Sequence, residues 1–346
     1  MQESITIRNF GPIKDISIEN IRPLTIFTGE SGSGKSTILK VIVLFRWIYK
    51  MLNIRSYLKY AHISQSPFNF EFKSYLNNNG FSDYLYPNSE IIYQKGKTKI
   101  YYRNKLGFSS TVPQEELSLE KMCFVSDKRN LIPDILAGYK TDMSFFLNET
   151  FNDFRNSEEY IKELNIDYLG VKYSSEKTSS GIKYYILGNQ SKYKIKLEDA
   201  SSGTQTLVPL SVIIEYFSKH YDFSSRFNKI IFDYLSRNDS LKDFKATQNI
   251  GDIRYKNIHI HIEEPELSLY PESQRKLINF IVNRCFVEPH NGYEMTVMLA
   301  THSPYITNHL NLLIKAGEKE KLIEGAKLAY ENLSVYQVED GKINDF

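Results

Sequence analysis

A glycine-rich segment near the start of the chain has residue types suited to binding phosphate. It runs Gly29-Glu30-Ser31-Gly32-Ser33-Gly34-Lys35-Ser36-Thr37 and fits the pattern GxxxxGK[ST]. Its glycines let backbone N–H groups converge on phosphate oxygens, because no Cβ stands in the way. Lys35 would supply a cation to the β- and γ-phosphates, and Ser36 would ligate Mg²⁺. The segment predicts a site for a nucleoside triphosphate.

Two adjacent carboxylates follow an apolar run much later in the chain. The run is Ile258 to Ile262, and Glu263, Glu264 and Pro265 come directly after it. Together with a phosphate-binding loop, Glu263 is predicted to hold Mg²⁺ through water. Glu264 would accept a proton from the attacking water or orient it. Without that loop, an exposed acidic turn would explain the pair almost as well.

Two further segments could contact the γ-phosphate. The first is Ser202-Gly203-Thr204-Gln205, which opens a predicted helix whose N-terminus would attract phosphate. Ser202 is also a plausible N-cap of that helix. In the second, a predicted strand that ends at Ala300 is followed by Thr301 and His302. His302 could hydrogen-bond the γ-phosphate and maintain the geometry of the attacking water.

Strands that alternate with helices are expected to position these residues. Strands are predicted at residues 4–8, 13–18, 24–27, 258–262 and 295–300, and helices at 36 to about 50, 202 to about 218 and 271–283. Such alternation favours an α/β core with a largely parallel sheet. The glycine-rich loop then lies between a strand and a helix, as a phosphate-binding loop requires.

The middle of the chain is less regular. Hairpins are expected from the pairs 91–93 with 98–102 and 183–187 with 192–197, a strand at 121–125 and a helix at 145–164. We therefore expect an ATPase core of residues 1–52 and 191–346. Residues 53–190 would be a mixed α+β insertion and a partner- or ligand-binding surface.

Composition excludes few classes of protein. The formal net charge is +2, too small to argue for nucleic-acid binding by itself. Cys123 and Cys285 lie far apart and read as reduced cysteines of a cytosolic protein. The most apolar stretch, Val41 to Leu52, is shorter than the roughly 20 residues of a membrane span. We expect a cytoplasmic protein without a membrane segment.

The four motifs, in this order, resemble those of the ABC ATPase superfamily. The resemblance implies a P-loop NTPase of ABC type, with a mixed sheet, flanking helices, and ATP and Mg²⁺ as cofactors. It assigns Gly29–Thr37 as the Walker A motif, Ser202–Gln205 as the signature and Glu263-Glu264 as the Walker B motif. It assigns Glu266–Leu269 as the D-loop and His302 as the switch histidine. A homodimer is implied, since each ATP would lie between Lys35 of one chain and Ser202 of the other.

Longer stretches resemble a narrower branch, the SMC-like and OLD-like ATPases, many of which are subunits of bacterial phage-defence systems. These stretches are residues 7–13 and 263–271, and the run 124–129 adds a strand followed by an arginine. The chain departs from the common pattern in Thr204, which replaces a glycine, and in Glu263, where Asp is commoner. The glutamine of the Q-loop stays open among Gln65, Gln94 and Gln114.

Several roles for the ATPase are compatible with the sequence. The preferred one is a switch subunit in anti-phage defence that controls a separate effector such as a nuclease. Only a final helix and a strand at 333–338 have room after His302, so effector chemistry is expected from another polypeptide. The alternative is a DNA-repair or chromosome-maintenance ATPase that binds nucleic acid through basic and aromatic residues of the hairpin at 93–108. A transporter subunit is less favoured, and so is a scaffold that binds ATP without turnover.

Overall fold

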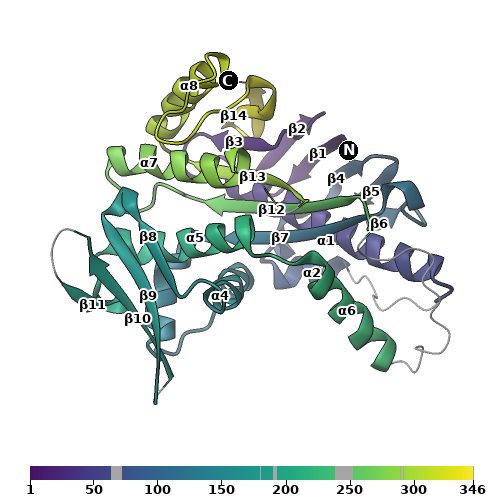
Figure 1. The fold of residues 1–346 in the computed structure, drawn as a ribbon. Coiled ribbons are helices and arrows are strands. Elements are labelled where there is room, and N and C mark those ends of the chain that lie inside the picture. Colours follow the sequence, from purple (N-terminus) through teal and green to yellow (C-terminus); the bar gives the residue numbers. More distant parts are fainter. Residues whose placement is uncertain are drawn as a thin grey trace.

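The computed structural model describes residues 1–63, 72–179, 181–189, 193–237, 252–288, 290 and 292–345. These residues form two large sheets and a smaller third one, with helices between and around them (Figure 1). Their buried apolar side chains belong to one connected core cluster. The α/β class, with a mixed sheet and flanking helices, is confirmed.

The first large sheet is antiparallel and has the strand order β2-β1-β4-β5-β6. In β1 the side chains alternate, so that Ile5 and Ile7 are buried while Thr6 and Arg8 face outward. Its strands are β1 (Glu3–Phe10), β2 (Ile13–Ile18), β4 (Leu85–Lys95), β5 (Thr98–Arg103) and β6 (Lys105–Phe108).

The second large sheet has the order β15-β14-β3-β13-β12-β7, and only β15 is antiparallel to its neighbour. Its strands are β3 (Leu24–Thr28), β7 (Ser118–Val125), β12 (Tyr255–Glu263), β13 (Glu294–Thr301), β14 (Leu333–Glu339) and β15 (Lys342–Asp345). Glu263 is paired in register with Ala300, and Thr301 with Thr28. Three candidate site segments therefore leave the sheet at one edge.

Helix α1 (Lys35–Tyr60) contacts both large sheets. Its buried residues lie on every side of the helix, as expected for a helix with no solvent face. The predicted end near Lys50 was wrong by ten residues. The packing of α1 between two layers, which cannot be read from a single helical stripe, determines its length.

The remaining helices are α2 (Phe72–Asn78), α3 (Ile132–Leu136), α4 (Phe145–Glu158), α5 (Ser202–Lys219), α6 (Phe223–Arg237), α7 (Pro271–Val282) and α8 (Pro304–Glu318). The predicted helix at 145–164 ends six residues early, because its last residues enter a strand of the third sheet. That antiparallel sheet comprises β8 (Glu163–Ile166), β9 (Val171–Thr178), β10 (Gly181–Gly188) and β11 (Lys194–Lys196).

The range 53–190 contributes to all three sheets. Strand β4 pairs with β1, and β7 pairs with β12, although β4 and β7 come from the range expected to be an insertion. The third sheet is built almost entirely from that range. The boundaries at 52 and 191 remain a prediction. None of the described helices is long and apolar enough to cross a membrane.

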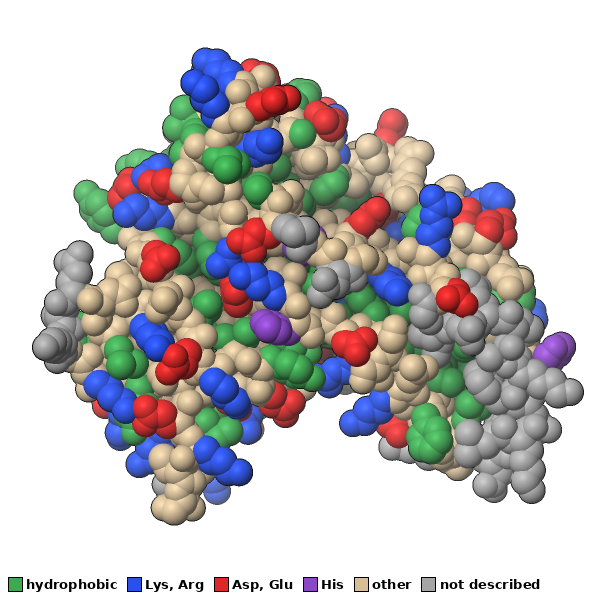
Figure 2. All heavy atoms as spheres, in the orientation of Figure 1, with side chains coloured by type: hydrophobic (Ala, Val, Ile, Leu, Met, Phe, Trp, Pro, Cys, Tyr) green, Lys and Arg blue, Asp and Glu red, His purple; other side chains and the backbone are tan. Residues whose placement is uncertain are grey.

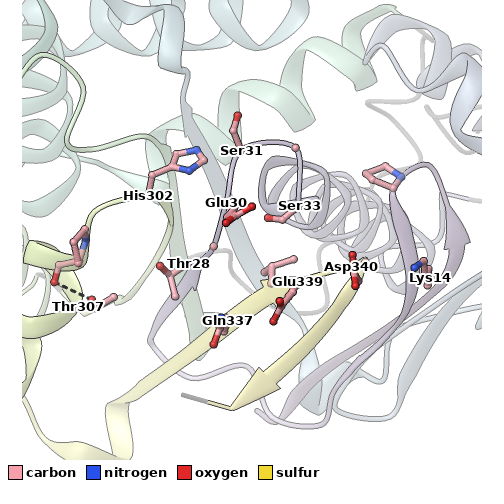
Figure 3. Close-up of a pocket in the computed structure, with 16 residues that line it drawn as sticks. Lys14, Thr28, Glu30, Ser31, Ser33, His302, Thr307, Gln337, Glu339 and Asp340 are labelled. Atoms are coloured by element: carbon pink, nitrogen blue, oxygen red, sulfur yellow. Dashed lines mark hydrogen bonds between the residues drawn. The ribbon is translucent and has the colours of Figure 1, made fainter.

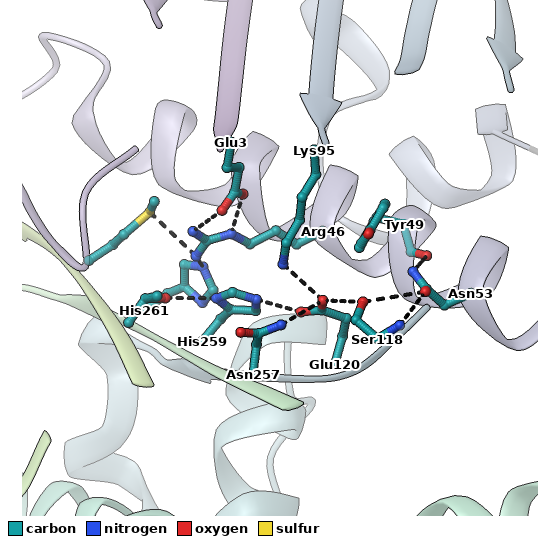
Figure 4. A network of polar contacts seen from close by, with 12 residues as sticks. Glu3, Arg46, Tyr49, Asn53, Lys95, Ser118, Glu120, Asn257, His259 and His261 are labelled. Atoms are coloured by element: carbon teal, nitrogen blue, oxygen red, sulfur yellow. Dashed lines mark hydrogen bonds and ion pairs between the residues drawn. The ribbon is translucent and has the colours of Figure 1, made fainter. Parts of the chain in front are cut away.

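A buried ion pair joins α1 to both large sheets (Figure 4). Arg46 Nε and Nη2 donate to the two carboxylate oxygens of Glu3 on β1, at 2.7 and 2.9 Å. Arg46 Nη1 lies 2.9 Å from His261 Nε2 on β12, and Tyr93 on β4 donates to Glu3 at 2.9 Å. Arginine has no acceptor, so His261 Nε2 accepts and its Nδ1–H donates to the carbonyl of Cys123.

A second buried group extends this network along β12. The carboxylate of Glu120 on β7 accepts hydrogen bonds from Lys95, Ser118, Asn257 and His259. Burial raises the pKa of Glu120, but Lys95 and the hydrogen bond from His259 outweigh that effect and hold the pKa well below its usual range. Burial and the charges of Arg46 and Lys95 lower the pKa of His259 to about 4. His259 is therefore a neutral donor at neutral pH.

We expect Glu3→Gln to lower the free energy of unfolding by roughly 3–5 kcal/mol at pH 7, because the variant leaves the Arg46 charge buried without its counter-ion. The double variant Glu3→Gln/Arg46→Met should lose less than the sum of the two single losses. Urea unfolding monitored by circular dichroism measures both quantities. If the double variant instead lost as much free energy of unfolding as the two single variants together, the two side chains would not interact.

The same pair predicts a dependence of stability on pH. Burial raises the pKa of Glu3, but Arg46 outweighs it and brings the pKa to about 2, below the usual 4.5. The Glu3 contribution is thus complete above pH 4.5 and is lost as the pH falls toward 2. Wild type should lose more free energy of unfolding than Glu3→Gln across that window. Parallel curves for the two proteins would contradict the assignment.

Candidate active site

The glycine-rich loop connects β3 to α1 and curves around the N-terminus of the helix. Gly29, Gly32 and Gly34 all have positive φ. A Cβ at Gly29 would lie 2.3 Å from the carbonyl oxygen of Val338, and one at Gly34 would lie 2.6 Å from the Ile13 side chain. Glycine is therefore required at both positions, by conformation and by space.

Lys35 is the first residue of α1 and points back into this loop. Its Nζ donates to the carbonyl oxygens of Gly29 and Glu30, at 3.0 and 2.7 Å, and lies 3.3 Å from Ser33 Oγ. Burial lowers the pKa of Lys35, while Glu264 and Glu266 act in the opposite direction. The ammonium is held where the loop N–H groups and the positive end of the helix also favour an anion.

Glu263 ends β12 beside the start of α1 and fits a Mg²⁺ site. Its side chain is 3% exposed, and Oε1 pairs with Lys40 of α1 at 2.8 Å. Its Oε2 is buried and has no hydrogen-bond partner. Burial raises the pKa of Glu263, and Lys40 and a hydrogen bond from Ser36 oppose that shift. An unpaired carboxylate oxygen next to a hydroxyl suits a water-coordinated divalent cation.

The described residues contain no group of three or more His, Cys, Asp or Glu that could hold a metal ion. Ser36 and Glu263 would therefore share the cation with nucleotide phosphates. Lys40 was missed in the sequence. Its spacing from Ser36 places it one helical turn further along α1, but only the fold brings Glu263 to it.

Glu264 and His302 lie together at the edge of the sheet. Their side chains are 38% and 35% exposed, with His302 Nε2 3.6 Å from Glu264 Oε1. Glu264 has φ +43°, a conformation uncommon for a residue with a side chain, and its N–H donates to Ala300 at 2.8 Å. The backbone therefore leaves β12 sharply at this residue, and its carboxylate reaches solvent beside the histidine.

Arg129 stabilises this sharp turn through hydrogen bonds to its backbone. It is fully buried, and its guanidinium donates to the carbonyl oxygens of Glu263 at 2.8 Å and Glu264 at 2.7 Å. A third bond, of 3.1 Å, goes to Ser126. Burial lowers the pKa of Arg129 to about 10, so the group stays charged at neutral pH. One planar side chain thus fixes the backbone from which both carboxylates, Glu263 and Glu264, project.

Glu266 joins the turn to the end of β13. Its Oε2 accepts from Thr301 Oγ1 at 2.8 Å, and its Oε1 accepts from the backbone N–H of His302 at 2.6 Å. The sequence identified Glu266 only as part of the expected D-loop. The sequence could not reveal its contact with His302, because 35 residues lie between the two.

The expected signature segment starts α5 on a different surface. Ser201, and not Ser202 as expected, is the N-cap: its Oγ accepts from the Thr204 N–H at 3.4 Å, so Ser202 is left exposed as the first helical residue. A Cβ at Gly203 would lie 3.0 Å from the carbonyl oxygen of Ser268. The helix start therefore packs closely against the expected D-loop.

A cavity of about 820 Å³ lies over the glycine-rich loop (Figure 3). Residues 28–33 form one wall, His302 and Thr307 a second, and residues 337–341 of the β14–β15 hairpin a third. None of Ser202, Gly203, Thr204 and Gln205 is among its lining residues. The loop and His302 line this cavity, whereas the other predicted site residues, Lys35, Ser36, Glu263, Glu264 and the signature residues, are not among its lining residues. Both glutamates and His302 still lie at one edge of the sheet.

Two further predictions concern the middle of the chain: the glutamine of the Q-loop and a nucleic-acid surface on the hairpin. Gln65 lies outside the described residues, and neither Gln94 nor Gln114 lines the cavity, so no Q-loop residue is assigned. Of the basic and aromatic residues of the hairpin, Tyr93, Lys95 and Tyr102 are buried, whereas Lys99, Tyr101 and Arg103 share the exposed face of β5. Figure 2 shows acidic and basic side chains interspersed on the face in view.

Family comparisons agree with this geometry. A model described as "AAA ATPase domain" matches residues 1–47, and one described as "AAA domain, putative AbiEii toxin, Type IV TA system" matches residues 57–308. The second covers most of the chain, and the protein belongs to that family of AAA-domain ATPases. The predicted ABC-type ATPase class is confirmed. No curated protein matches the chain.

Three solved structures with a similar course of the chain are distant in sequence. The SMC head domain from Thermotoga maritima has 12% identity and a TM-score of 0.42, over 100% of this chain and 98% of that one. The Smc head domain with ScpA, derived from Pyrococcus furiosus, has 10% identity and a TM-score of 0.44, over 99% and 95%. A RecF recombination mediator has 10% identity and a TM-score of 0.36, over 100% and 98%. These values carry no argument about function.

We expect Arg129→Lys to lower kcat for ATP hydrolysis about 10–100-fold with little change in ATP affinity, because a lysine cannot donate to both carbonyl groups and Glu264 would shift. Steady-state kinetics and nucleotide titration measure the two effects. Arg103→Lys, at an exposed arginine of β5, is the matched control. A folded Arg129→Lys protein with normal kcat would remove Arg129 from this role.

Proposed function

We propose that the protein binds and hydrolyses ATP as a homodimer and acts as a switch that controls a separate effector. The observation that carries the proposal is the convergence of Lys35, Glu263, Glu264 and His302 at one sheet edge. Glu263 contacts α1 through Lys40 and Glu264 lies beside His302, while Ser202 is exposed at the start of α5, where it is open to a second chain. Such a half-site is complete only when Ser202 of the partner subunit supplies the helix start.

The roles of the residues follow from their surroundings. Lys35 and the loop N–H groups bind the phosphates, and Ser36 with Glu263 would hold Mg²⁺, which neutralises phosphate charge when bound. Glu264, partly exposed and next to His302, orients the attacking water and accepts its proton. His302 hydrogen-bonds the γ-phosphate. Arg129 and Glu266 keep these two side chains in place through backbone contacts.

The biological setting is also a proposal. The matched family model names a toxin of a type IV TA system, which supports a role in a toxin or defence system. We propose bacterial anti-phage defence, with dimer closure controlling an effector such as a nuclease. A DNA-repair ATPase remains the alternative. Burial removes Tyr93, Lys95 and Tyr102 from any DNA-binding face of the hairpin and leaves Lys99, Tyr101 and Arg103 exposed on β5.

We expect Glu264→Gln to lower turnover by roughly 10²–10⁴-fold and to accumulate an ATP-bound dimer, since binding is intact while water activation is lost. Lys35→Ala should stay monomeric under the same conditions. Size-exclusion chromatography with light scattering, with ATP and Mg²⁺, measures both. Glu294→Gln, at the exposed start of β13, is the control.

Protein or nucleic acid that co-purifies with Glu264→Gln identifies the biological role. A nuclease-like protein would support the effector role, and bound DNA would support the repair alternative. If Glu264→Gln, Lys35→Ala and wild type assemble identically, the ATP-sandwiched dimer is wrong.

A composite site also predicts complementation between defective chains. Lys35→Ala and Ser202→Arg should each be inactive alone. A mixed dimer combines both defects in one site and leaves the other intact, so an equimolar mixture should recover roughly a quarter of wild-type turnover. An ATPase assay on the mixture tests this. Recovery of nothing, with both chains folded and mixed dimers present, would argue against a shared site.

A further inference from the structure

A second cavity, of about 310 Å³, is lined by charged and aromatic side chains. It lies beside Lys50, in the second half of α1 and away from the glycine-rich loop. Helices α1, α4, α5 and α6, Lys121 of β7 and the segment after α5 contribute to its wall. Figure 1 shows α4 directly below α5, with α6 further to the right. Its charged lining residues are Lys50, Lys121, Asp153, Arg226, Lys229 and Asp233.

The charges in this cavity do not balance. Lys121 pairs with Asp153 at 2.7 Å, and its ammonium also lies 5.1 Å from the ring centroid of Phe217. That pair is neutral as a whole. Lys50, Arg226 and Lys229 then face two further carboxylates, Asp233 on the cavity wall and Glu149 of α4, which acts on Lys50. The excess of positive charge favours an anionic occupant.

Lys50 is the most unusual of these cations. It is only partly exposed, and among the described residues its ammonium has no hydrogen bond or ion-pair partner. Burial and the repulsion of Lys121 lower its pKa to about 8, although Asp153 and Glu149 act in the opposite direction. A poorly hydrated, unpaired ammonium costs free energy that a bound anion would offset.

Arg226 adds unused donors to the same space. A guanidinium carries five N–H donors, and within the described part of the chain its one hydrogen bond goes to Tyr216, at 3.4 Å. Its planar fork matches the oxygens of phosphate or carboxylate. Lys229 lies one helical turn further along α6, on the same wall.

We propose that this cavity binds a small oxyanion of the phosphate or phosphate-monoester class, with Lys50, Arg226 and Lys229 as its ligands. Its volume lies at the lower end of the range of small-molecule sites, which suits a compact ligand. The tyrosine and phenylalanine side chains of α5 form an amphipathic wall on which the carbon part of a monoester can pack.

The position of the cavity connects it to the ATP site, and this step rests on the proposed function. Lys50 is on the helix that begins at the glycine-rich loop, about 22 Å beyond Lys35 at 1.5 Å per residue. Tyr216 and Phe217 are in the last turn of the helix that begins at Ser202. An anion here would join α1, through Lys50, to Arg226, which donates a hydrogen bond to Tyr216 of α5. It would thus favour one relative orientation of α1 and α5.

Competitive acetylation with acetic anhydride, followed by peptide mass mapping, tests the cavity in the full-length protein without ATP. Lys50 should become reactive with a midpoint near pH 8. Inorganic phosphate at four times its Kd should slow labelling of Lys50 about fivefold, because only the free site reacts. The exposed Lys99 should be unaffected, and Arg226→Gln should lose the protection. Glycerol phosphate in place of phosphate distinguishes a monoester site from a free-phosphate site.

Three results would overturn the proposal: labelling of Lys50 that neither anion slows, equal protection in Arg226→Gln, or a Lys50 that reacts at no pH. The labelling needs neither ATP nor a dimer, so its failure is separate from failure of the proposed function. The link to ATP has its own readout. Glycerol phosphate should change the ATP concentration needed for dimerisation of Glu264→Gln, but not of Glu264→Gln/Lys50→Met. No change in the first variant would remove the link and leave the binding site.

Discussion

The bidentate pair of Arg46 and Glu3 holds the helix that follows the glycine-rich loop between two sheets. Both side chains are almost fully buried, so neither charge can exchange its partner for water. The same guanidinium also reaches His261 on β12, the strand that ends at Glu263 and leads directly into Glu264. The phosphate-binding helix and the carboxylate-bearing strand are therefore held in one relative position. The candidate site lies at the ends of both elements.

At the edge of the sheet, Glu264 and His302 are positioned through contacts to backbone atoms. Arg129 contacts two successive carbonyl oxygens, and Glu266 contacts a backbone N–H and a hydroxyl, so neither depends on the identity of the side chain that it orients. Glu264 and His302 are left partly exposed, and Glu263 keeps one buried oxygen without a partner. An unpaired buried oxygen costs stability, which is typical where structure is reserved for a ligand.

The two cavities are related through the helices α1 and α5. Each helix begins at a segment expected to meet ATP and continues to the cationic cavity among α4, α5 and α6. A rigid helix transmits a small change of orientation along its whole length. The first cavity is lined by the glycine-rich loop, whereas the second is lined by none of the residues predicted to bind ATP.

The sequence by itself determined the local chemistry. The spacing of Gly29 to Thr37, and the apolar run before Glu263-Glu264, are local patterns, because a loop and a strand end are each coded by neighbouring residues. Most strands and the start of α5 followed in the same way, although the cap moved to Ser201. Tertiary structure decided what depends on distant segments: the length of α1 between two layers, the pairing of β4 and β7 with core strands, and the partners of Glu263 and His302. It also buried Tyr93 and Lys95, whose alternating pattern could not reveal which face of the hairpin would be covered. Burial and long-range hydrogen bonds arise only when sheets and helices pack, and no window of sequence contains that information.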